Sequence, residues 1–241
     1  MIEQLLAVRP APPAETWVLL ASAVLAALLC LPRATWRWFG LVVTVVHELG
    51  HALAGLTTGR RVLRIRIEAD HSGVTHTFGT SASAVWSTFW GYPFPAVVGA
   101  VWAAGAGAGR WPLVAALSAA VLVISLIVMR GWLSWCVTLG AAAAMIALLA
   151  ADPAIGRWIM LAVGTALWVG SLRVWWILAR RQARASLSGR GADRLRHHPQ
   201  GLPSDAAALA RATGVPALVW TAVFLLVILA CGAAVLLTWL G

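Results

Sequence analysis

Two histidines four residues apart, His47 and His51, lie within a long apolar stretch. On a helix this spacing puts both side chains on one face, one turn apart, so both imidazoles can reach a single ion. Glu48 directly follows the first histidine, where its carboxylate can address a water bound to that ion. The HExxH pattern thus contains two metal ligands and a general base for peptide hydrolysis. We therefore predict that His47 and His51 hold Zn²⁺ and that Glu48 is the catalytic base.

The motif stands inside the apolar run 38–56. Ionisable groups at membrane depth are energetically expensive and usually mark a functional site. The alternative is a chance match, in which the histidines only form hydrogen bonds inside a helix bundle, since short motifs also occur by chance. The cost of placing ionisable side chains in such a run favours the metal site.

The composition is that of a polytopic membrane protein. Of the 241 residues 61% are hydrophobic and 11% are charged, and the mean hydropathy is +0.85, whereas a soluble domain carries about 25% charged residues. The net charge of +10 comes from 18 arginines. They lie in short loops between apolar segments, which indicates membrane orientation and not nucleic-acid binding. The cysteines, Cys30, Cys136 and Cys231, fall inside predicted spans, so we expect neither a disulfide framework nor a cysteine zinc site.

We predict a single all-α, membrane-embedded domain over residues 1–241. Its apolar segments predict about seven transmembrane helices, and the very short connection at residues 130–131 leaves six or eight open. The predicted spans are 16–31, 36–56, 91–108, 111–129, 132–150, 158–178 and 216–240. An N-terminal tail, 1–15, precedes the first span, and a basic loop, 179–215, precedes the last.

The segment 57–80 is the least membrane-like part of the first half. Residues 61–68 alternate basic and apolar side chains, which is strand periodicity. Residues 70–73 can turn, and residues 74–78 can return as a second strand. We predict a β-hairpin beside the motif helix. Its edge could hold an extended peptide by main-chain pairing, or the hairpin is an ordinary surface feature.

Seven spans place alternate loops on opposite sides of the membrane, and the arginines divide unequally between the sides. Thirteen lie in the tail, the hairpin segment, the 130–131 connection and the basic loop, four lie on the other side, and Arg173 lies within a span. The positive-inside rule makes the first side cytoplasmic. We therefore expect a multi-pass protein of the cell membrane with a cytoplasmic N-terminus. All six histidines and every acidic residue except Asp152 fall on or near that side.

A catalytic zinc usually has three protein ligands and a water, so the motif lacks one ligand. We favour Asp205, which begins a short helix of small residues before the last span and can point back at the metal from a second element. An aspartate in that place can also simply cap the helix. The candidates on the same side are Glu68, Asp70, His71, His76, Asp193, His197, His198 and Asp205, with His198 and Asp70 next after the favoured one.

Together these residues resemble the site-2 protease family of intramembrane zinc metallopeptidases, and in particular its minimal, actinobacterial-type bacterial branch. The segment 45–62 resembles the family's first motif, a membrane helix with HExxH that leads into a β-hairpin. Residues 91–96 (GYPFPA) occupy the place of its glycine-proline segment, and residues 201–205 (GLPSD) are similar to its late proline-then-aspartate motif. The aspartate of that motif is the third zinc ligand, which the resemblance implies for Asp205.

The functional prediction is an intramembrane zinc metallopeptidase that hydrolyses membrane-spanning substrates near the cytoplasmic side. A membrane helix must unwind to expose its peptide bond, because helical carbonyls are already hydrogen-bonded. The main alternative is a catalytically inactive, peptidase-like scaffold or metal-binding protein. A transporter with a His/Glu relay is disfavoured because the ionisable residues gather at one end of the bundle. The expected partners are the lipid bilayer and a membrane-protein substrate, with no nucleic acid; the sequence leaves the substrate and the oligomeric state open.

Overall fold

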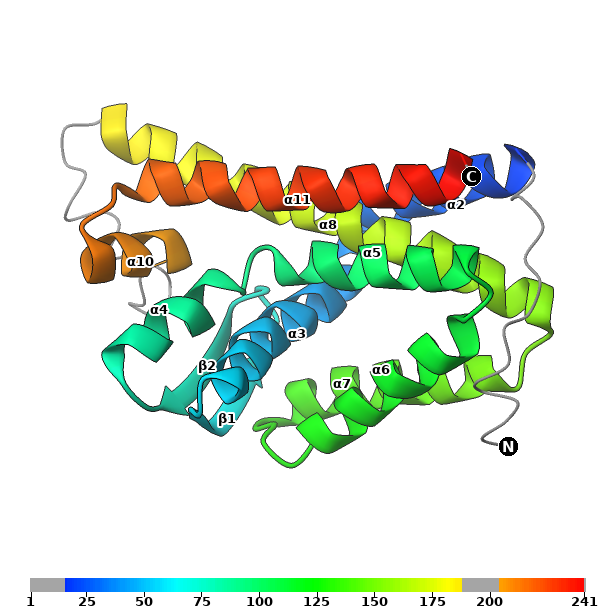
Figure 1. Ribbon diagram of the computed structural model, residues 1–241, viewed down its shortest axis with the longest axis horizontal. Coiled ribbons are helices and arrows are strands. Elements are labelled where there is room, and N and C mark those ends of the chain that lie inside the picture. Colours follow the sequence, from blue (N-terminus) through cyan, green and yellow to red (C-terminus); the bar gives the residue numbers. More distant parts are fainter. Residues whose placement is uncertain (1–15, 188–203, 241) are drawn as a thin grey trace.

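The computed structural model describes residues 16–187 and 204–240, which form nine helices and a two-stranded antiparallel sheet (Figure 1). The strands are β1 (Arg61–Ile67) and β2 (Gly73–Phe78). The predicted tail 1–15 lies outside the described residues. The helices are α2 (Thr16–Cys30), α3 (Arg33–Thr57), α4 (Ser81–Phe89), α5 (Phe94–Gly107), α6 (Trp111–Ser125), α7 (Trp132–Leu149), α8 (Pro153–Leu187), α10 (Asp205–Thr213) and α11 (Ala217–Leu240).

Four of the described helices, α3, α7, α8 and α11, are long and apolar enough to cross a membrane. The helices α2, α5 and α6 are apolar too, but have only 15, 14 and 15 residues, fewer than the about 20 that span a hydrocarbon core. The prediction of a mostly helical membrane protein with a small hairpin is confirmed. The predicted spans coincide with these apolar helices, and the number of crossings stays a prediction.

The longest helix, α8, is the element along which α2, α5 and α11 pack (Figure 1). A side chain at Gly99 of α5 would collide with the carbonyl oxygen of Gly164, and one at Gly164 would come within 2.7 Å of the Gly99 carbonyl oxygen. The two backbones therefore touch, as small residues permit between membrane helices. Helix α8 continues beyond its predicted span to Leu187, so the segment 179–215 begins as helix and not as loop.

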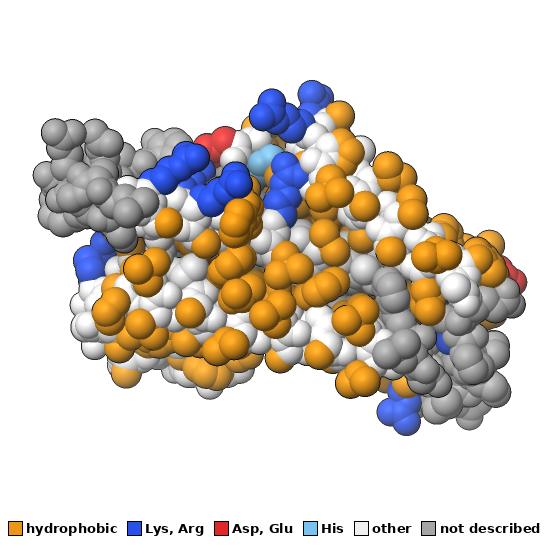
Figure 2. Space-filling view, turned by 90° about the horizontal axis from the view of Figure 1, so that it is seen from above, with side chains coloured by type: hydrophobic (Ala, Val, Ile, Leu, Met, Phe, Trp, Pro, Cys, Tyr) orange, Lys and Arg blue, Asp and Glu red, His pale blue; other side chains and the backbone are white. Residues whose placement is uncertain are grey.

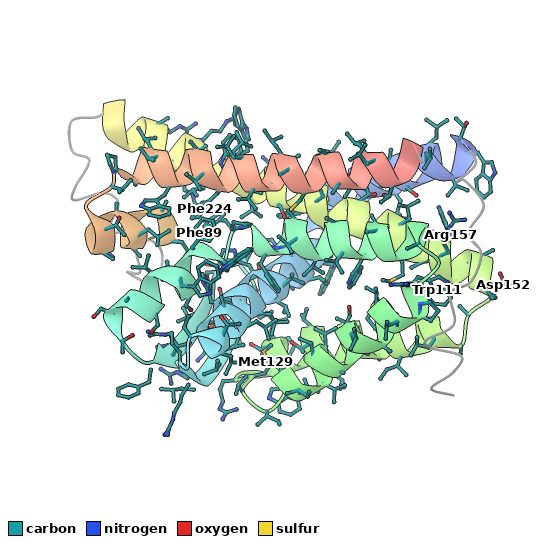
Figure 3. All side chains as sticks on the ribbon, in the orientation of Figure 1. Phe89, Trp111, Met129, Asp152, Arg157 and Phe224 are labelled. Carbon is teal, nitrogen blue, oxygen red and sulfur yellow. The ribbon has the colours of Figure 1, made fainter. Side chains whose placement is uncertain are left out.

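A short bend at Leu31 and Pro32 joins α2 to α3, and the two helices do not fold back on each other as two separate spans would (Figure 1). The N–H of Leu31 still bonds the carbonyl of Ala27 at 2.8 Å, so the helical pattern runs into the bend. Helix α2 begins at the end of the molecule where Asp152 and Arg157 lie, whereas α4 and α10 lie at the other end (Figure 1, Figure 3). The first described helix therefore starts at the end of the molecule opposite α4 and α10, and the side of the membrane on which the N-terminus lies stays a prediction.

Arg173 of α8 holds the bend in place. Its guanidinium donates hydrogen bonds to the carbonyl oxygens of Cys30 and, at 3.0 Å, of Leu31. It also lies over the ring of Trp36, 4.4 Å from the centroid. The last carbonyls of a helix lack partners within the helix, so a charged donor from α8 satisfies the end of α2 at the bend.

The predicted hairpin is present, with Ile65 of β1 opposite Thr75 of β2. Ile65 is fully buried. The other edge of β1 is also paired, because the Ile65 N–H donates to the carbonyl of Val128 and the Arg130 N–H donates to the carbonyl of Ile65, both at 2.8 Å. The connection between α6 and α7 thus pairs with the hairpin like a third strand. The hairpin is anchored through the buried Ile65 and Ile67, and its other strand residues are exposed or half-buried.

The outer surface is largely apolar. Hydrophobic side chains cover most of the face shown in Figure 2. The arginines on this face lie at the left and along the upper middle of the view, with others at its lower right. An apolar exterior with basic residues at its margins is expected of helices that contact lipid.

Candidate metal centre

The HExxH residues lie in the second half of α3, where nearly every turn is buried against the rest of the bundle. The Nε2 atoms of His47 and His51 lie 3.2 Å apart. Both histidine side chains are mostly buried, with 17% and 13% of their surface exposed. The helix therefore directs both imidazoles toward one point, as the spacing predicts.

Asp205 reaches the same point from α10. Its Oδ2 atom lies 3.2 Å from Nε2 of His47 and 3.3 Å from Nε2 of His51. Helix α10 is held there by the fully buried Leu209, which belongs to the same apolar cluster as Phe224 of α11. Figure 3 shows Phe224 beside α10, at the end of the molecule that contains this group.

The capping role considered for Asp205 belongs to its neighbour. Ser204 is the N-cap of α10, and its hydroxyl accepts the N–H of Ala207 at 3.4 Å. Asp205 is the first helical residue, so its carboxylate is available to the histidines.

The spacing of the three ligand atoms fits a tetrahedral metal ion. Among the described residues, His47, His51 and Asp205 form the group whose ligand atoms lie close enough to hold one ion. Around a tetrahedral zinc with ligand distances of about 2.0–2.1 Å, neighbouring ligand atoms lie about 3.3 Å apart. The observed separations are 3.2, 3.2 and 3.3 Å.

The carboxylate of Asp205 also has the chemistry of a metal ligand. Its Oδ2 atom is buried and accepts no well-directed hydrogen bond from the described residues. Burial alone would raise the pKa of this carboxyl, but the nearby His51 and His47 outweigh burial and hold that pKa well below its ordinary value. The group is therefore ionised near neutral pH, and a cation between the three ligand atoms would satisfy Oδ2.

Ser87 of α4 fixes the orientation of His51. Nδ1 of His51 lies 2.8 Å from the carbonyl oxygen of Ser87, and a carbonyl oxygen only accepts hydrogen bonds. Nδ1 therefore carries a proton, and the neutral ring would present the lone pair of Nε2 toward His47 and Asp205. Metal-binding histidines commonly have such a second partner on the other ring nitrogen.

Glu48 faces the hairpin. Its side chain is buried, with 3% of its surface exposed, and its Oε2 atom accepts a hydrogen bond from the hydroxyl of Thr75 at 2.6 Å. A side chain at Gly73 would collide with Oε1 of the same carboxylate. Strand β2 therefore shapes the space around the predicted base from two positions.

The segment between α4 and α5 closes the site from a third side. A side chain at Gly91 would collide with the ring of His51 and with Oδ2 of Asp205. The ring of Tyr92 packs edge-on against His47, with centroids 4.9 Å apart, and stacks on Phe224 at 5.4 Å. The glycine-proline segment singled out in the sequence thus lies directly against the ligand group.

The other described candidates for the third ligand do not lie with His47 and His51. Asp70 accepts hydrogen bonds from the N–H and the hydroxyl of Ser72 within the hairpin turn. The described candidates that lie away from the group are Glu68, Asp70, His71 and His76. The remaining ones, Asp193, His197 and His198, lie outside the described residues.

A comparison with protein-family models shows the family to which the chain belongs. The model of the family described as Peptidase M50B-like matches residues 20–235, a range that includes the motif, the hairpin and Asp205. The chain belongs to the Peptidase M50B-like family. Membership confirms the resemblance to site-2 proteases and indicates a metallopeptidase kind of activity, with membrane proteins as the class of substrate. Comparisons with curated proteins and with solved structures gave no match.

Sequence reasoning singled out His47, His51 and Asp205, which this M50B-like chain brings together. It also singled out Glu48, which directly follows His47, and the roles of all four stay predictions. It did not single out Ser87 or Thr75. The period-2 alternation of residues 74–78 could have shown that Thr75 and Gly73 share one face of β2. No sequence signal points to Ser87, because a serine in a short helix has many possible partners.

Proposed function

We propose that the chain is an intramembrane zinc endopeptidase. The observation that carries this proposal is the convergence of His47 Nε2, His51 Nε2 and Asp205 Oδ2 within 3.3 Å of one another, beside the buried carboxylate of Glu48. Two neutral imidazoles and one carboxylate form a ligand set that leaves room for a water, as in catalytic zinc sites.

In this proposal Zn²⁺, held by His47, His51 and Asp205, supplies Lewis acidity and lowers the pKa of a water toward ~7. The carboxylate of Glu48 accepts a proton from the attacking water and delivers it to the departing amine nitrogen. The peptide C–N bond breaks, and the products are a new carboxylate and a new amine. The burial of Glu48 keeps bulk water away from the base during these transfers.

We further propose that an unwound substrate segment pairs with the outer edge of β2. Among the described elements β2 pairs only with β1, and an extended peptide can extend a sheet at such an edge. A probe peptide carrying N-methyl groups on the backbone around its cleavage site should then show a raised KM and an unchanged kcat. Equal KM values for the methylated and unmodified peptides would argue against pairing at this edge.

We place the metal centre toward the cytoplasm, because described arginines at the end of α8, in α10 and in the hairpin outnumber Arg110 and Arg157 at the other end. Helix α2 then begins on the opposite side. Single cysteines introduced as Arg211→Cys and Arg157→Cys in a cysteine-free background test this. A membrane-impermeant thiol reagent added to intact cells should label position 157 and spare position 211, and the reverse pattern would invert the orientation.

Zinc content is the first test of the metal site. Protein purified in detergent without chelators should contain about one zinc per chain. His47→Ala and Asp205→Ala should both lose it, and Glu48→Gln should keep it, because Glu48 is not a ligand in this proposal. Zinc lost only with His47→Ala would remove Asp205 from the ligand set.

Hydrolysis is the second test. The probe is a fluorophore–quencher peptide with one membrane span containing a central glycine pair, reconstituted with the protein in liposomes. The wild-type protein should cleave it, and Glu48→Gln should be slower by about 10²–10⁴-fold, the usual contribution of a general base. Stoichiometric zinc without cleavage across a panel of such peptides would favour the non-enzymatic scaffold.

A further inference from the structure

Glu48 has an unusual setting for a buried carboxylate. Only 3% of its surface is exposed, and among the described residues it forms no ion pair within 4.0 Å. A buried charge without a counter-ion needs hydrogen bonds to remain in place. The hydroxyl of Thr75 provides one at 2.6 Å from Oε2, and it also lies 3.2 Å from the backbone carbonyl oxygen of Glu48.

Thr75 is itself held firmly. It lies opposite Ile65, which is fully buried and is bonded through its backbone to Val128 and Arg130. The threonine is therefore in the best-anchored part of the sheet, and its β-branched side chain has few accessible rotamers. A donor on such a support can fix the direction of the carboxylate that it binds.

We propose that Thr75 is a positioning residue that aims the carboxylate of Glu48 at the attacking water. This inference rests on the proposed role of Glu48 as the general base. Thr75 donates its hydroxyl hydrogen to Oε2, and the absent side chain of Gly73 leaves Oε1 free space on the same strand. The bond selects one orientation of the carboxylate, and misplacement of a catalytic group by about 1 Å can cost about 10²-fold in rate.

The kinetic test uses Thr75→Val, which keeps the shape of the side chain and removes the hydroxyl, and Thr75→Ser, which restores the hydroxyl. With the fluorophore–quencher peptide, Thr75→Val should lower kcat by about 10- to 100-fold with KM unchanged and zinc content intact. Thr75→Ser should return kcat to within a few-fold of the wild type. A Thr75→Val protein with the wild-type kcat, or a Thr75→Ser protein as slow as Thr75→Val, would overturn the proposal.

The matched control is Thr77→Val. Thr77 lies on the same face of β2, and its hydroxyl accepts a hydrogen bond from Nε of Arg60 at 2.9 Å, not from the site. This variant should keep kcat within about twofold of the wild type, because the hydroxyl that it removes contacts Arg60 and not Glu48. An equal loss in Thr77→Val would assign the effect to hairpin stability and would contradict the positioning role.

A second readout separates this proposal from the proposed function, because it needs no hydrolysis. The thermal unfolding midpoint in detergent is measured for Thr75→Val, Glu48→Leu and the double variant. If Thr75 holds the carboxylate, Thr75→Val lowers the midpoint by more in the wild-type background than in the Glu48→Leu background, where the hydroxyl still has the backbone carbonyl of residue 48 as an acceptor. Equal shifts in both backgrounds would refute the contact. An absence of cleavage by the wild-type protein would instead count only against the peptidase assignment.

Discussion

Ser87 and His51 are joined by two reciprocal hydrogen bonds. Nδ1 of His51 donates to the carbonyl oxygen of Ser87 at 2.8 Å, and the hydroxyl of Ser87 donates to the carbonyl oxygen of His51 at 2.7 Å. The short helix α4 is thereby fixed to the motif helix at the point where a ring nitrogen must be presented. One residue in α4 thus contacts both the ring and the backbone of His51.

Ser87→Ala removes only the second of these bonds, because the carbonyl that orients the ring belongs to the backbone. We expect the free energy of unfolding to fall by about 1 kcal/mol and zinc affinity to fall by less than about tenfold, the lower limit of typical effects of residues behind metal ligands. Thermal unfolding and competition with a zinc chelator measure the two effects. A complete loss of zinc would show that the hydroxyl, and not the carbonyl, controls the ring.

Gly91→Ala should weaken zinc binding strongly. The added methyl group would collide with the ring of His51 and with Oδ2 of Asp205, so at least one ligand must move. We expect a loss of affinity of at least about tenfold, measured by the same chelator competition. The control is Gly140→Ala, since a side chain there meets nothing within 4 Å. Similar zinc affinities in both variants would contradict the observed packing of Gly91.

Gly73→Ala should separate turnover from metal binding. A methyl group at this position would collide with Oε1 of Glu48, whereas neither histidine of the motif lies among the atoms nearest to it. We expect zinc content to stay at the wild-type level and kcat to fall by about 10²-fold, because the base is displaced. Zinc content and the rate of peptide cleavage are measured on the same preparation. Loss of both zinc and cleavage would contradict this separation and would indicate a wider disturbance of the hairpin.

Removal of zinc should destabilise the folded protein. Zinc that binds the folded chain at about 1,000 times its Kd contributes about 4 kcal/mol, which corresponds to roughly 10 °C in the unfolding midpoint of a chain of this size. Dialysis against a chelator should therefore lower the midpoint, and added zinc should restore it. The His47→Ala protein should respond to neither treatment, and an equal response in that variant would place the stabilising zinc elsewhere.

Arg173→Leu should loosen the junction of α2 and α3 without affecting the metal. Two carbonyls, those of Cys30 and Leu31, lose a charged donor, and the loss of such a bond costs about 1.5–3 kcal/mol. We expect a lower midpoint of thermal unfolding with unchanged zinc content. Arg173→Lys keeps the charge over Trp36, so its unfolding midpoint should lie between those of the wild type and Arg173→Leu. An Arg173→Leu protein with the wild-type midpoint would show that the bend needs no such donor.

The sequence predicted the elements of the fold better than their arrangement. Apolar runs and strand periodicity are local patterns, so the helices and the hairpin appear close to their predicted bounds. The course of the chain at Leu31 and Pro32 depends on packing against α8, which no local pattern contains. A proline after an apolar run therefore suggested the end of a span, where the structure has a bend secured by Arg173.

The candidate site, like the fold, could be predicted from the sequence only in part. His47, Glu48 and His51 follow from helix geometry, because residues four apart share a face. Asp205 was favoured among several acids and histidines, and its place beside them depends on the packing of Leu209 under α10. Ser87 and Thr75 act through hydrogen bonds to residues far away in the chain. Such contacts produce no periodic pattern in the sequence.

The two backbone hydrogen bonds of Ile65 have a mechanical consequence. Because the Ile65 N–H is bonded to Val128 and its carbonyl to Arg130, β1 cannot swing away from α3 on its own. Any displacement of the hairpin must either break this pair of bonds or carry the ends of α6 and α7 with it. The hairpin beside Glu48 is therefore fixed to the connection between α6 and α7. The freedom of these two helices to move limits how far the site can widen to admit a polypeptide.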